Sequence, residues 1–357
     1  MTAQTSTQSI FLLAMALLIP GCAVLPRTPV PTPSPSATST SLPTPEPTRR
    51  GPSATPTQLR APTITQTPTL TLSPTPSFTP TRWPLAAGKI TRVDTKFRSV
   101  ILGLDQRILI YLPPGYANQA QRRYPVLYML HGYGGYNLPN TTEWEQWGLK
   151  DSAERMMNDG TSQPMILVQP FGYMPDGQAT YFFNHGPGTD GKRWGDYIWQ
   201  DVVGYVDTNY RTIPRRDSRA IGGFSLGGQG ALSLSLTHPE VFKGVGGHSP
   251  SFRGADGSIP VLNDEQWYDQ FDPIWLVKNT DTAHQLNIWL DVGQDDDKVR
   301  SCGAGSDRCV EAYHALLVSK NVPHEWHDHW AGGHDGAYWM YNIPDYIGFY
   351  SANLVGH

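Results

Sequence analysis

The sequence predicts an α/β fold with a mainly parallel central sheet and helices on both faces. Two observations carry this prediction. Through the middle of the chain, short apolar runs of strand type alternate with longer segments of helical periodicity. Several runs, such as 124–130 and 286–292, are dense in apolar residues, which is typical of strands that are covered on both faces. Right-handed crossovers between such strands give a parallel sheet.

The expected elements follow in chain order. Strands at 97–104 and 107–112 are joined by Asp105-Gln106 and end at a Pro-Pro-Gly turn. Further strands are expected at 124–130, 164–169, 220–224, 242–248, 286–292 and 322–328. Apolar residues near helical spacing predict helices over 147–158, 194–210, 226–236, 310–318 and 338–354. We expect Pro344 to interrupt the last helix, because proline has no N–H to donate.

Composition divides the 357 residues into a tail and a domain. Residues 23–84 are mostly Pro, Thr and Ser, with too few apolar side chains to form a core, so we expect a disordered, extended tether. Residues 85–357 have the size of one large domain. The formal net charge of −4 gives no basic surface for nucleic acid, which we do not expect as a partner.

The first 22 residues have the features of an export signal. The apolar run from Ile10 to Pro20 is too short to span a bilayer and suits the hydrophobic region of a signal peptide. It ends in Leu18-Ile-Pro-Gly-Cys22, which resembles the lipobox whose cysteine is lipid-modified in bacterial lipoproteins. Pro20 and the lack of Lys or Arg before Arg27 depart from that pattern, which leaves an ordinary secretory signal as the alternative. We expect an exported protein, lipid-anchored at the bacterial cell surface or otherwise secreted.

The three cysteines fit an exported protein. Cys22 belongs to the lipobox-like motif. Cys302 and Cys309 flank a short loop, and we expect a disulfide between them in an oxidising compartment.

The stretch Gly223-Phe-Ser-Leu-Gly227 is a G-x-S-x-G match between a predicted strand and a predicted helix. A serine at such a tight turn has strained backbone and an exposed hydroxyl, and small residues on both sides relieve the crowding. The helix that follows directs its free N–H groups toward any anion that forms there. Taken alone, the motif fits equally well a glycine-rich turn with a solvated serine.

A second glycine-rich turn, His131-Gly-Tyr-Gly-Gly135, follows the predicted strand 124–130. Glycines at such a turn let backbone N–H groups face a cavity without side chains in the way. The alternative is a flexible turn without a role.

A serine nucleophile needs a base, and the base needs an acid that orients it. His334, in Gly332-Gly-His-Asp-Gly336 after the last predicted strand, is the candidate base. Acids follow the strand 286–292 at Asp295-Asp-Asp297. Serine, acid and histidine therefore occur in the chain order that is typical of hydrolases with a G-x-S-x-G turn between a strand and a helix. The residues alone leave the choice among these three aspartates open, and Asp291 at the strand end is a weaker rival.

These four motifs resemble the putative-esterase family of α/β hydrolases, over about residues 90–355. The family includes esterase D, tributyrin esterases, feruloyl and acetylxylan esterases, and mycolyltransferases of the antigen 85 type. The resemblance implies an α/β-hydrolase fold. It also implies Ser225 as nucleophile, His334 as base, Asp296 as acid, and the backbone N–H groups of Tyr133 and Leu226 as oxyanion donors.

The implied activity is that of a serine carboxylic-ester hydrolase that passes through an acyl-serine and needs no metal or organic cofactor. We expect acyl esters of carbohydrates, of acetyl or feruloyl type, or short-chain esters as substrates, because an exported enzyme meets polysaccharides. An acyltransferase of the mycolyltransferase type and a catalytically silent surface binding module are the alternatives. The oligomeric state has no signature in the sequence.

Two side-chain groups near the motifs complete the candidates. Aromatic residues beside the motif loops form a candidate wall for a sugar or phenolic group: Tyr133, Tyr136, Trp144, Trp147, Trp330 and Trp339. A metal site is a minor alternative, because its residues lack a helical H-E-x-x-H pattern: His324, His327, Asp328 and His329.

Overall fold

The computed structural model describes residues 83, 86–134, 142–174, 177, 179–254, 259 and 262–356. The expected signal segment, residues 1–22, lies outside the described residues, as does the expected tether apart from Trp83. None of the helices in the described part of the chain is both long enough and apolar enough to cross a membrane.

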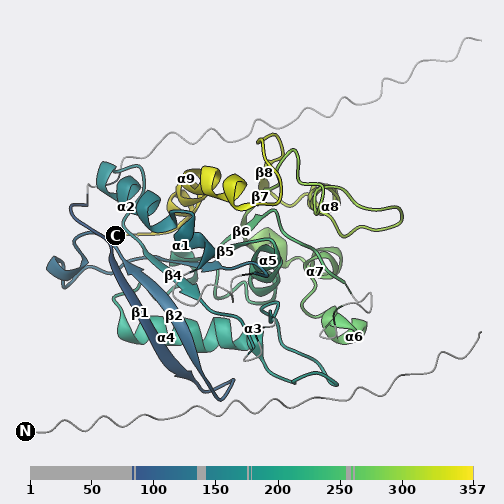
Figure 1. Cartoon of the computed structure of the whole chain (residues 1–357), viewed down its shortest axis with the longest axis horizontal. Helices are drawn as coiled ribbons and strands as arrows, with labels where there is room; N and C mark the ends of the chain where they lie inside the picture. The colour runs from purple at the N-terminus through teal and green to yellow at the C-terminus, as the bar shows by residue number, and fades with distance from the viewer. Residues whose placement is uncertain are drawn as a thin grey trace, which may run out of the picture. The chain divides into compact units, whose positions relative to one another are not determined.

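The described residues form an eight-stranded sheet in the order β1-β2-β4-β3-β5-β6-β7-β8 (Figure 1). Its strands are β1 (Thr91–Ser99), β2 (Leu104–Leu112), β3 (Val126–Leu130), β4 (Ile166–Pro170), β5 (Arg219–Phe224), β6 (Gly244–His248), β7 (Asn287–Asp291) and β8 (His324–His327). The β1–β2 and β2–β4 pairs are antiparallel, and every other neighbouring pair is parallel. The predicted, mainly parallel sheet is therefore confirmed.

The first hairpin differs from its prediction. Asp105-Gln106, the expected turn, lies inside β2, and the chain turns instead over 100–103. Gly103 there has a φ of +64°, which glycine adopts without steric cost. The sequence misled because this turn contains Val100, Ile101 and Leu102, and Val100 is 87% exposed. An apolar run alone does not distinguish a turn from a strand.

Helices cover both faces of the sheet, as predicted (Figure 1). Alternate strand residues explain this arrangement: Ile108 and Ile110 of β2 belong to one core cluster, and Leu109 and Tyr111 belong to the other. The second cluster is closed by α1 (Glu143–Gln146), α2 (Leu149–Asp159) and α9 (Gly336–Asn353).

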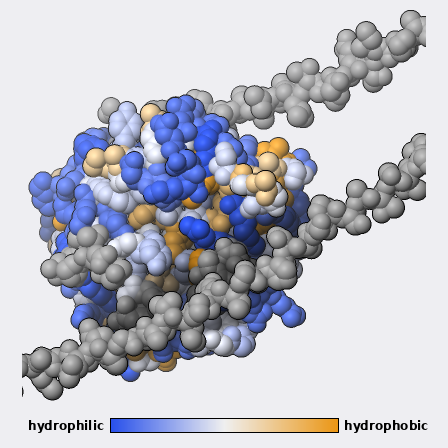
Figure 2. Space-filling model, turned by 45° about the vertical axis from the view of Figure 1, so that its right-hand side comes forward, coloured by the Kyte–Doolittle hydropathy of each residue, from blue (hydrophilic) through white to orange (hydrophobic). Residues whose placement is uncertain are grey.

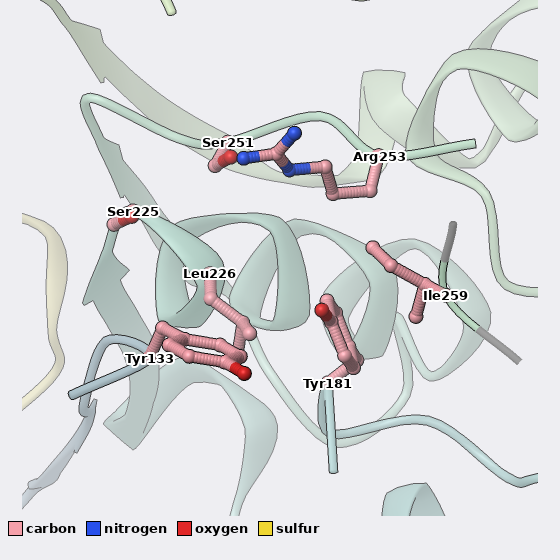
Figure 3. Close-up of a pocket in the computed structure, with 7 residues that line it drawn as sticks. All are labelled: Tyr133, Tyr181, Ser225, Leu226, Ser251, Arg253 and Ile259. Carbon is pink, nitrogen blue, oxygen red and sulfur yellow. The ribbon is translucent and has the colours of Figure 1, made fainter. Parts of the chain in front are cut away.

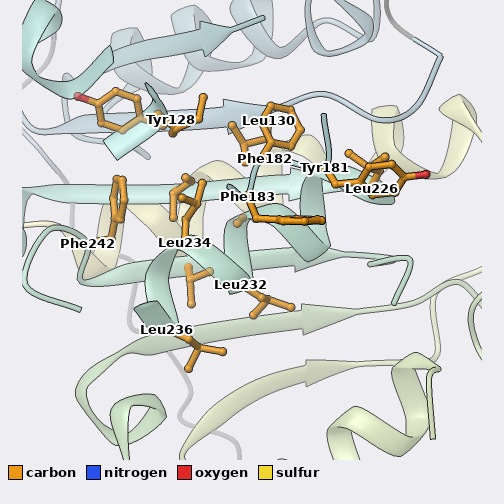
Figure 4. Packing of buried hydrophobic residues seen from close by; sticks show 14 of the residues in the cluster. Tyr128, Leu130, Tyr181, Phe182, Phe183, Leu226, Leu232, Leu234, Leu236 and Phe242 are labelled. Carbon is orange, nitrogen blue, oxygen red and sulfur yellow. The ribbon is translucent and has the colours of Figure 1, made fainter. Parts of the chain in front are cut away.

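On the opposite face, one helical segment is made of α3 (Trp194–Asp196), a π-helical stretch (Tyr197–Val202) and α4 (Val203–Asn209). The other helices of this face are α5 (Leu226–Thr237), α7 (Pro273–Asn279) and α8 (Val310–Ser319). Figure 4 shows Leu234 of α5 on the side that faces Tyr128 and Leu130 of β3, whereas Leu232 and Leu236 lie on the other side of the helix. The helix that begins beside Ser225 is thus packed on the centre of the sheet.

Two details of the helices depart from the sequence prediction. The last helix, α9, continues through Pro344, whose neighbours Ile343 and Ile347 are fully buried and hold the helix against the sheet. The short helices α6 (Glu265–Tyr268) and α7 were not predicted. Asp272 caps α7 by accepting a hydrogen bond from the Ile274 N–H, a local signal that a search for long apolar periodicity misses.

The expected disulfide joins Cys302 and Cys309, whose Cα atoms are 5.0 Å apart. It closes the loop that leads into α8, which starts at the residue after Cys309.

Candidate active site

Ser225 occupies a left-handed turn between β5 and α5, with φ of +52° and ψ of −121°. This conformation is costly for a residue with a Cβ and persists only where the surroundings enforce it. The flanking glycines show why they are required. A Cβ on Gly223 would lie 2.4 Å from the Gly227 carbonyl, and one on Gly227 would lie 2.5 Å from the His131 carbonyl. The G-x-S-x-G spacing therefore follows from backbone crowding.

Backbone hydrogen bonds hold this turn against the end of β6. The Ser225 N–H donates to the His248 carbonyl at 3.0 Å, and the Ser225 carbonyl accepts from the Ser251 N–H at 2.9 Å. The same carbonyl accepts from the N–H groups of Gly228 and Gln229 in the first turn of α5. The backbone of the strained residue is thus fixed from both sides.

The three residues predicted as nucleophile, base and acid form one hydrogen-bonded chain. His334 Nε2 lies 2.8 Å from Ser225 Oγ, and His334 Nδ1 lies 2.8 Å from Asp296 Oδ2. Asp296 is fully buried, and its Oδ1 accepts from the N–H groups of Lys298 and Val299 at 3.2 and 3.3 Å. These N–H groups offset the cost of burying the carboxylate. The arrangement leaves Nε2 as the acceptor for the serine proton.

The rival acids have other partners. Asp295 binds the backbone of the histidine loop: its N–H donates to the Gly332 carbonyl at 3.0 Å, and its Oδ2 accepts from the Gly332 N–H at 3.4 Å. Asp291 is fully buried one strand away, where its Oδ2 lies 2.7 Å from His248 Nδ1. Of the acids considered from the sequence, only Asp296 contacts the His334 ring.

The glycine turn after β3 lies beside the serine. The Gly132 carbonyl accepts from the Tyr173 hydroxyl at 2.9 Å and from His131 Nδ1 at 2.8 Å. In a trans peptide the carbonyl and the following N–H point in opposite directions, so these two bonds turn the Tyr133 N–H away from His131. Leu226 is the first residue of α5, so its N–H has no partner within the helix.

His131 and Tyr173 are residues whose roles the sequence did not reveal. Their rings stack with centroids 4.0 Å apart, and the Gly172 N–H donates to His131 Nε2 at 2.8 Å. Because Nδ1 faces a carbonyl and Nε2 accepts from an N–H, His131 is neutral and protonated at Nδ1. The His-Gly pair was a usable signal for His131, whereas Tyr173 lies forty-one residues from Gly132 in sequence and carried none.

A pocket of about 310 Å³ opens beside the serine (Figure 3). Its lining is Tyr133, Tyr181, Ser225, Leu226, Ser251, Arg253 and Ile259. Tyr133 is 61% exposed. The face of the molecule seen in Figure 2 is mostly hydrophilic, with scattered apolar groups.

Of the predicted aromatic wall, Tyr133 lines this pocket, and the tryptophans do not. Trp144 and Trp339 are buried in the core, where Trp339 packs edge-on against His334 at 5.0 Å and stacks on Trp147 at 5.2 Å. Trp330 packs on Trp289, and Tyr136 lies outside the described residues. Trp339 therefore packs against His334 from the core, and Trp147 packs in turn on Trp339.

The histidines around β8 have neighbours other than a metal. His324 Nε2 lies 2.8 Å from His314 Nδ1, and His327 stacks on Trp289 at 4.0 Å. Across the described ranges, no three His, Cys, Asp or Glu side chains are grouped to hold a metal ion.

The burial of His131 makes a testable prediction about acid stability. Burial lowers the pKa of His131 from 6.5 to about 4. Between these values the unfolded chain binds a proton that the folded protein does not, so this histidine lowers stability as the pH falls from 6.5 toward 4. At pH 5 we expect a contribution of about 2 kcal/mol, measured as the difference between the wild-type and His131→Gln changes in unfolding free energy from pH 7 to pH 5. Equal pH dependence in urea titrations of both proteins would contradict this assignment.

Comparison with known proteins identifies a family. The sequence model described as "Esterase: Putative esterase" matches residues 99–350. An esterase of Mycobacterium tuberculosis is 30% identical over 263 residues, which cover 67% of this chain and 54% of that protein. This chain thus spans about half the length of that curated relative. An endo-1,4-beta-xylanase/feruloyl esterase of Xylanibacter ruminicola is 31% identical over 150 residues, covering 41% of this chain and 20% of that protein.

Solved structures share the fold. A ferulic acid esterase matches with a TM-score of 0.63 at 22% identity, covering 75% of this chain and 100% of that chain. An S-formylglutathione hydrolase from Agrobacterium tumefaciens matches with a TM-score of 0.60 at 15% identity, covering 76% and 98%. These likenesses confirm the predicted α/β-hydrolase fold. With the family match over residues 99–350, the chain belongs to the putative-esterase family of α/β hydrolases.

Proposed function

We propose that this chain is an exported serine carboxylic-ester hydrolase that acts through an acyl-serine intermediate. The observation that carries the proposal is the hydrogen-bonded chain from Ser225 through His334 to the buried Asp296 at a strained turn. Membership of an esterase family supports ester hydrolysis as the reaction. The serine, histidine and aspartate then act as nucleophile, base and orienting acid.

In the acylation step, His334 Nε2 takes the proton of Ser225 Oγ as Oγ bonds to the ester carbonyl carbon. The carbonyl oxygen becomes an oxyanion. When this tetrahedral intermediate collapses, the C–O bond to the alcohol breaks and His334 returns the proton to the leaving alcohol. Water then attacks the acyl-serine by the same route and releases the acid. Asp296 keeps the Nδ1–H tautomer of His334 in place and stabilises the imidazolium that forms.

The N–H groups of Tyr133 and Leu226 are the proposed donors to the oxyanion. Leu226 adds the positive end of the α5 dipole, because it begins that helix. Hydrogen bonds from His131 and Tyr173 to the Gly132 carbonyl support a fixed direction for the Tyr133 N–H. Preorganised donors of this kind require no reorganisation at the moment of reaction.

For substrates, we propose acyl esters of carbohydrates, of acetyl or feruloyl type. The partial match to a protein named endo-1,4-beta-xylanase/feruloyl esterase supports this choice. A pocket of about 310 Å³ is large enough for a small acyl group or one sugar ring. Its tyrosines, Tyr133 and Tyr181, offer aromatic faces to either.

The localisation is part of the same proposal: export, with a lipid anchor on Cys22 and residues 23–84 as a tether. The Cys302–Cys309 disulfide supports an oxidising compartment.

Ser225→Ala should lower kcat/KM for p-nitrophenyl acetate, acetylated xylan and methyl ferulate by at least about 1,000-fold, because it removes the hydroxyl that His334 Nε2 contacts. Asp296→Asn should cost about 100-fold or more, because the amide disturbs the His334 tautomer. Asp295→Asn is the matched control and should stay within about threefold of wild type. Comparable rates for Ser225→Ala and wild type would defeat the serine assignment.

Adding a sugar acceptor and measuring acyl-sugar against free acid separates hydrolysis from acyl transfer.

Tyr173→Phe should lower kcat about five- to tenfold with little change in KM, because the Tyr133 N–H loses one of the bonds that direct it. The phenyl ring keeps the stacking on His131, so the hydroxyl is the only group removed. Tyr205→Phe, on the far side of the sheet from α9, serves as the control and should be silent. A Tyr173→Phe enzyme with wild-type kcat would show that this hydroxyl does not position the oxyanion donor.

Cys22→Ala should release the expressed protein from the membrane fraction into the medium of a bacterial host, because the lipid attachment point is gone. Metabolic labelling with a fatty-acid analogue should mark wild type and leave Cys22→Ala unmarked. An unlabelled wild type that is already soluble in the medium would favour the ordinary secretory signal.

A further inference from the structure

The pocket beside Ser225 is apolar on one wall and cationic on the other. Tyr181, Leu226 and Ile259 supply apolar surface, whereas Ser251 and Arg253 supply polar groups. Figure 3 shows the Arg253 side chain extended along its wall toward Ser251, above the helix that begins at the serine. A guanidinium therefore lies on the wall of the pocket that contains the nucleophile.

The backbone of Arg253 is held firmly. Its N–H donates to Gln229 Oε1 at 2.9 Å, and Gln229 is a buried residue of α5, the helix that starts beside Ser225. The Arg253 carbonyl accepts from the Tyr268 hydroxyl at 3.0 Å and from Arg308 Nη1 at 3.0 Å. The backbone of this residue is thus fixed relative to the serine by a short chain of hydrogen bonds.

The guanidinium of Arg253, unlike its backbone, makes no ion pair or hydrogen bond with the described residues. Among the described residues, no carboxylate lies within ion-pair distance of Arg253, and no side-chain hydrogen bond engages its head group. The neighbouring Arg308 is the contrast, because its Nη2 lies 2.8 Å from the buried Asp272 carboxylate. Arg308 is thus neutralised by a carboxylate of the protein, whereas Arg253 lines the pocket and has no carboxylate partner among the described residues.

We propose that Arg253 binds a carboxylate of the substrate, so that the enzyme selects esters that carry a negative charge in their acyl or alcohol part. This inference rests on the proposed esterase function. A guanidinium pairs with a carboxylate through two parallel N–H···O bonds, which fix orientation as well as charge. Arg253 is exposed at the edge of this pocket of about 310 Å³, so water and salt partly screen such a pair, and the two-bond geometry supplies much of the selectivity. Acyl groups on an acidic polysaccharide fit this description.

Two matched ester pairs test the proposal. 4-Nitrophenyl hemiglutarate and its methyl ester differ by one charge on the acyl side, and 3-acetoxybenzoate and its methyl ester differ by one charge on the alcohol side. We expect wild type to favour the charged member of at least one pair by about tenfold or more in kcat/KM, mainly through KM. The pair that responds identifies which part of the substrate faces Arg253. The preference should shrink in 0.5 M salt.

Arg253→Gln should abolish this preference by lowering kcat/KM for the charged ester about tenfold more than for its neutral partner, because the charge is lost while the backbone contact with Gln229 remains. Arg215→Gln makes the same charge change before β5, at the opposite end of that strand from Ser225, and should keep the preference. Equal use of charged and neutral esters by wild type would overturn the proposal, as would an equal loss on both in Arg253→Gln. In either case Ser225-dependent hydrolysis of the neutral esters would leave the esterase function standing. Failure of wild type to hydrolyse any ester would overturn both.

Discussion

The left-handed backbone of Ser225 is the constraint on which the rest of the site depends. A conformation of this kind costs on the order of 1–3 kcal/mol, and packing must supply that energy. Here it comes from the carbonyl of His248, the N–H of Ser251, and two glycines that let β5, α5 and the end of β3 approach closely. The hydrogen bonds and close packing that offset this cost also hold the neighbouring loops in place.

A parallel sheet explains why these loops meet. The carboxyl ends of β3, β5, β6, β7 and β8 lie along one edge, and each end supplies a part of the site. The oxyanion turn follows β3, the nucleophile follows β5, and the loop with Arg253 follows β6. The loop with Asp296 follows β7, and the loop with His334 follows β8. Buried Asp291 ties this edge together, because its carboxylate accepts from His248, Trp289 and two tyrosines of α9.

The sequence was sufficient where a residue's role is local or depends on chain order. The five-residue G-x-S-x-G motif predicts the crowded turn around Gly223 and Gly227. The dense apolar runs separated by helical segments predict the parallel strands. It was insufficient where partners come from distant segments. Only the family resemblance distinguished Asp296 from Asp295, because the choice depends on which carboxylate faces His334 after folding. The proposed roles of Tyr173 and Arg253 likewise depend on residues that only folding brings beside them. At the first hairpin, the apolar residues of the turn around Val100 were predicted to belong to a strand. The pairing register of β1 with β2 shows that they form the turn.

The central claim is that folding makes the hydroxyl of Ser225 a nucleophile through His334. A fluorophosphonate probe reacts covalently with such a serine, and mass spectrometry of the digested protein locates the adduct. The proposed site predicts one stoichiometric adduct on the peptide that contains Ser225, strongly reduced in His334→Ala and absent after denaturation. An unmodified wild-type protein, or an adduct on another serine with Ser225 unmodified, would contradict it.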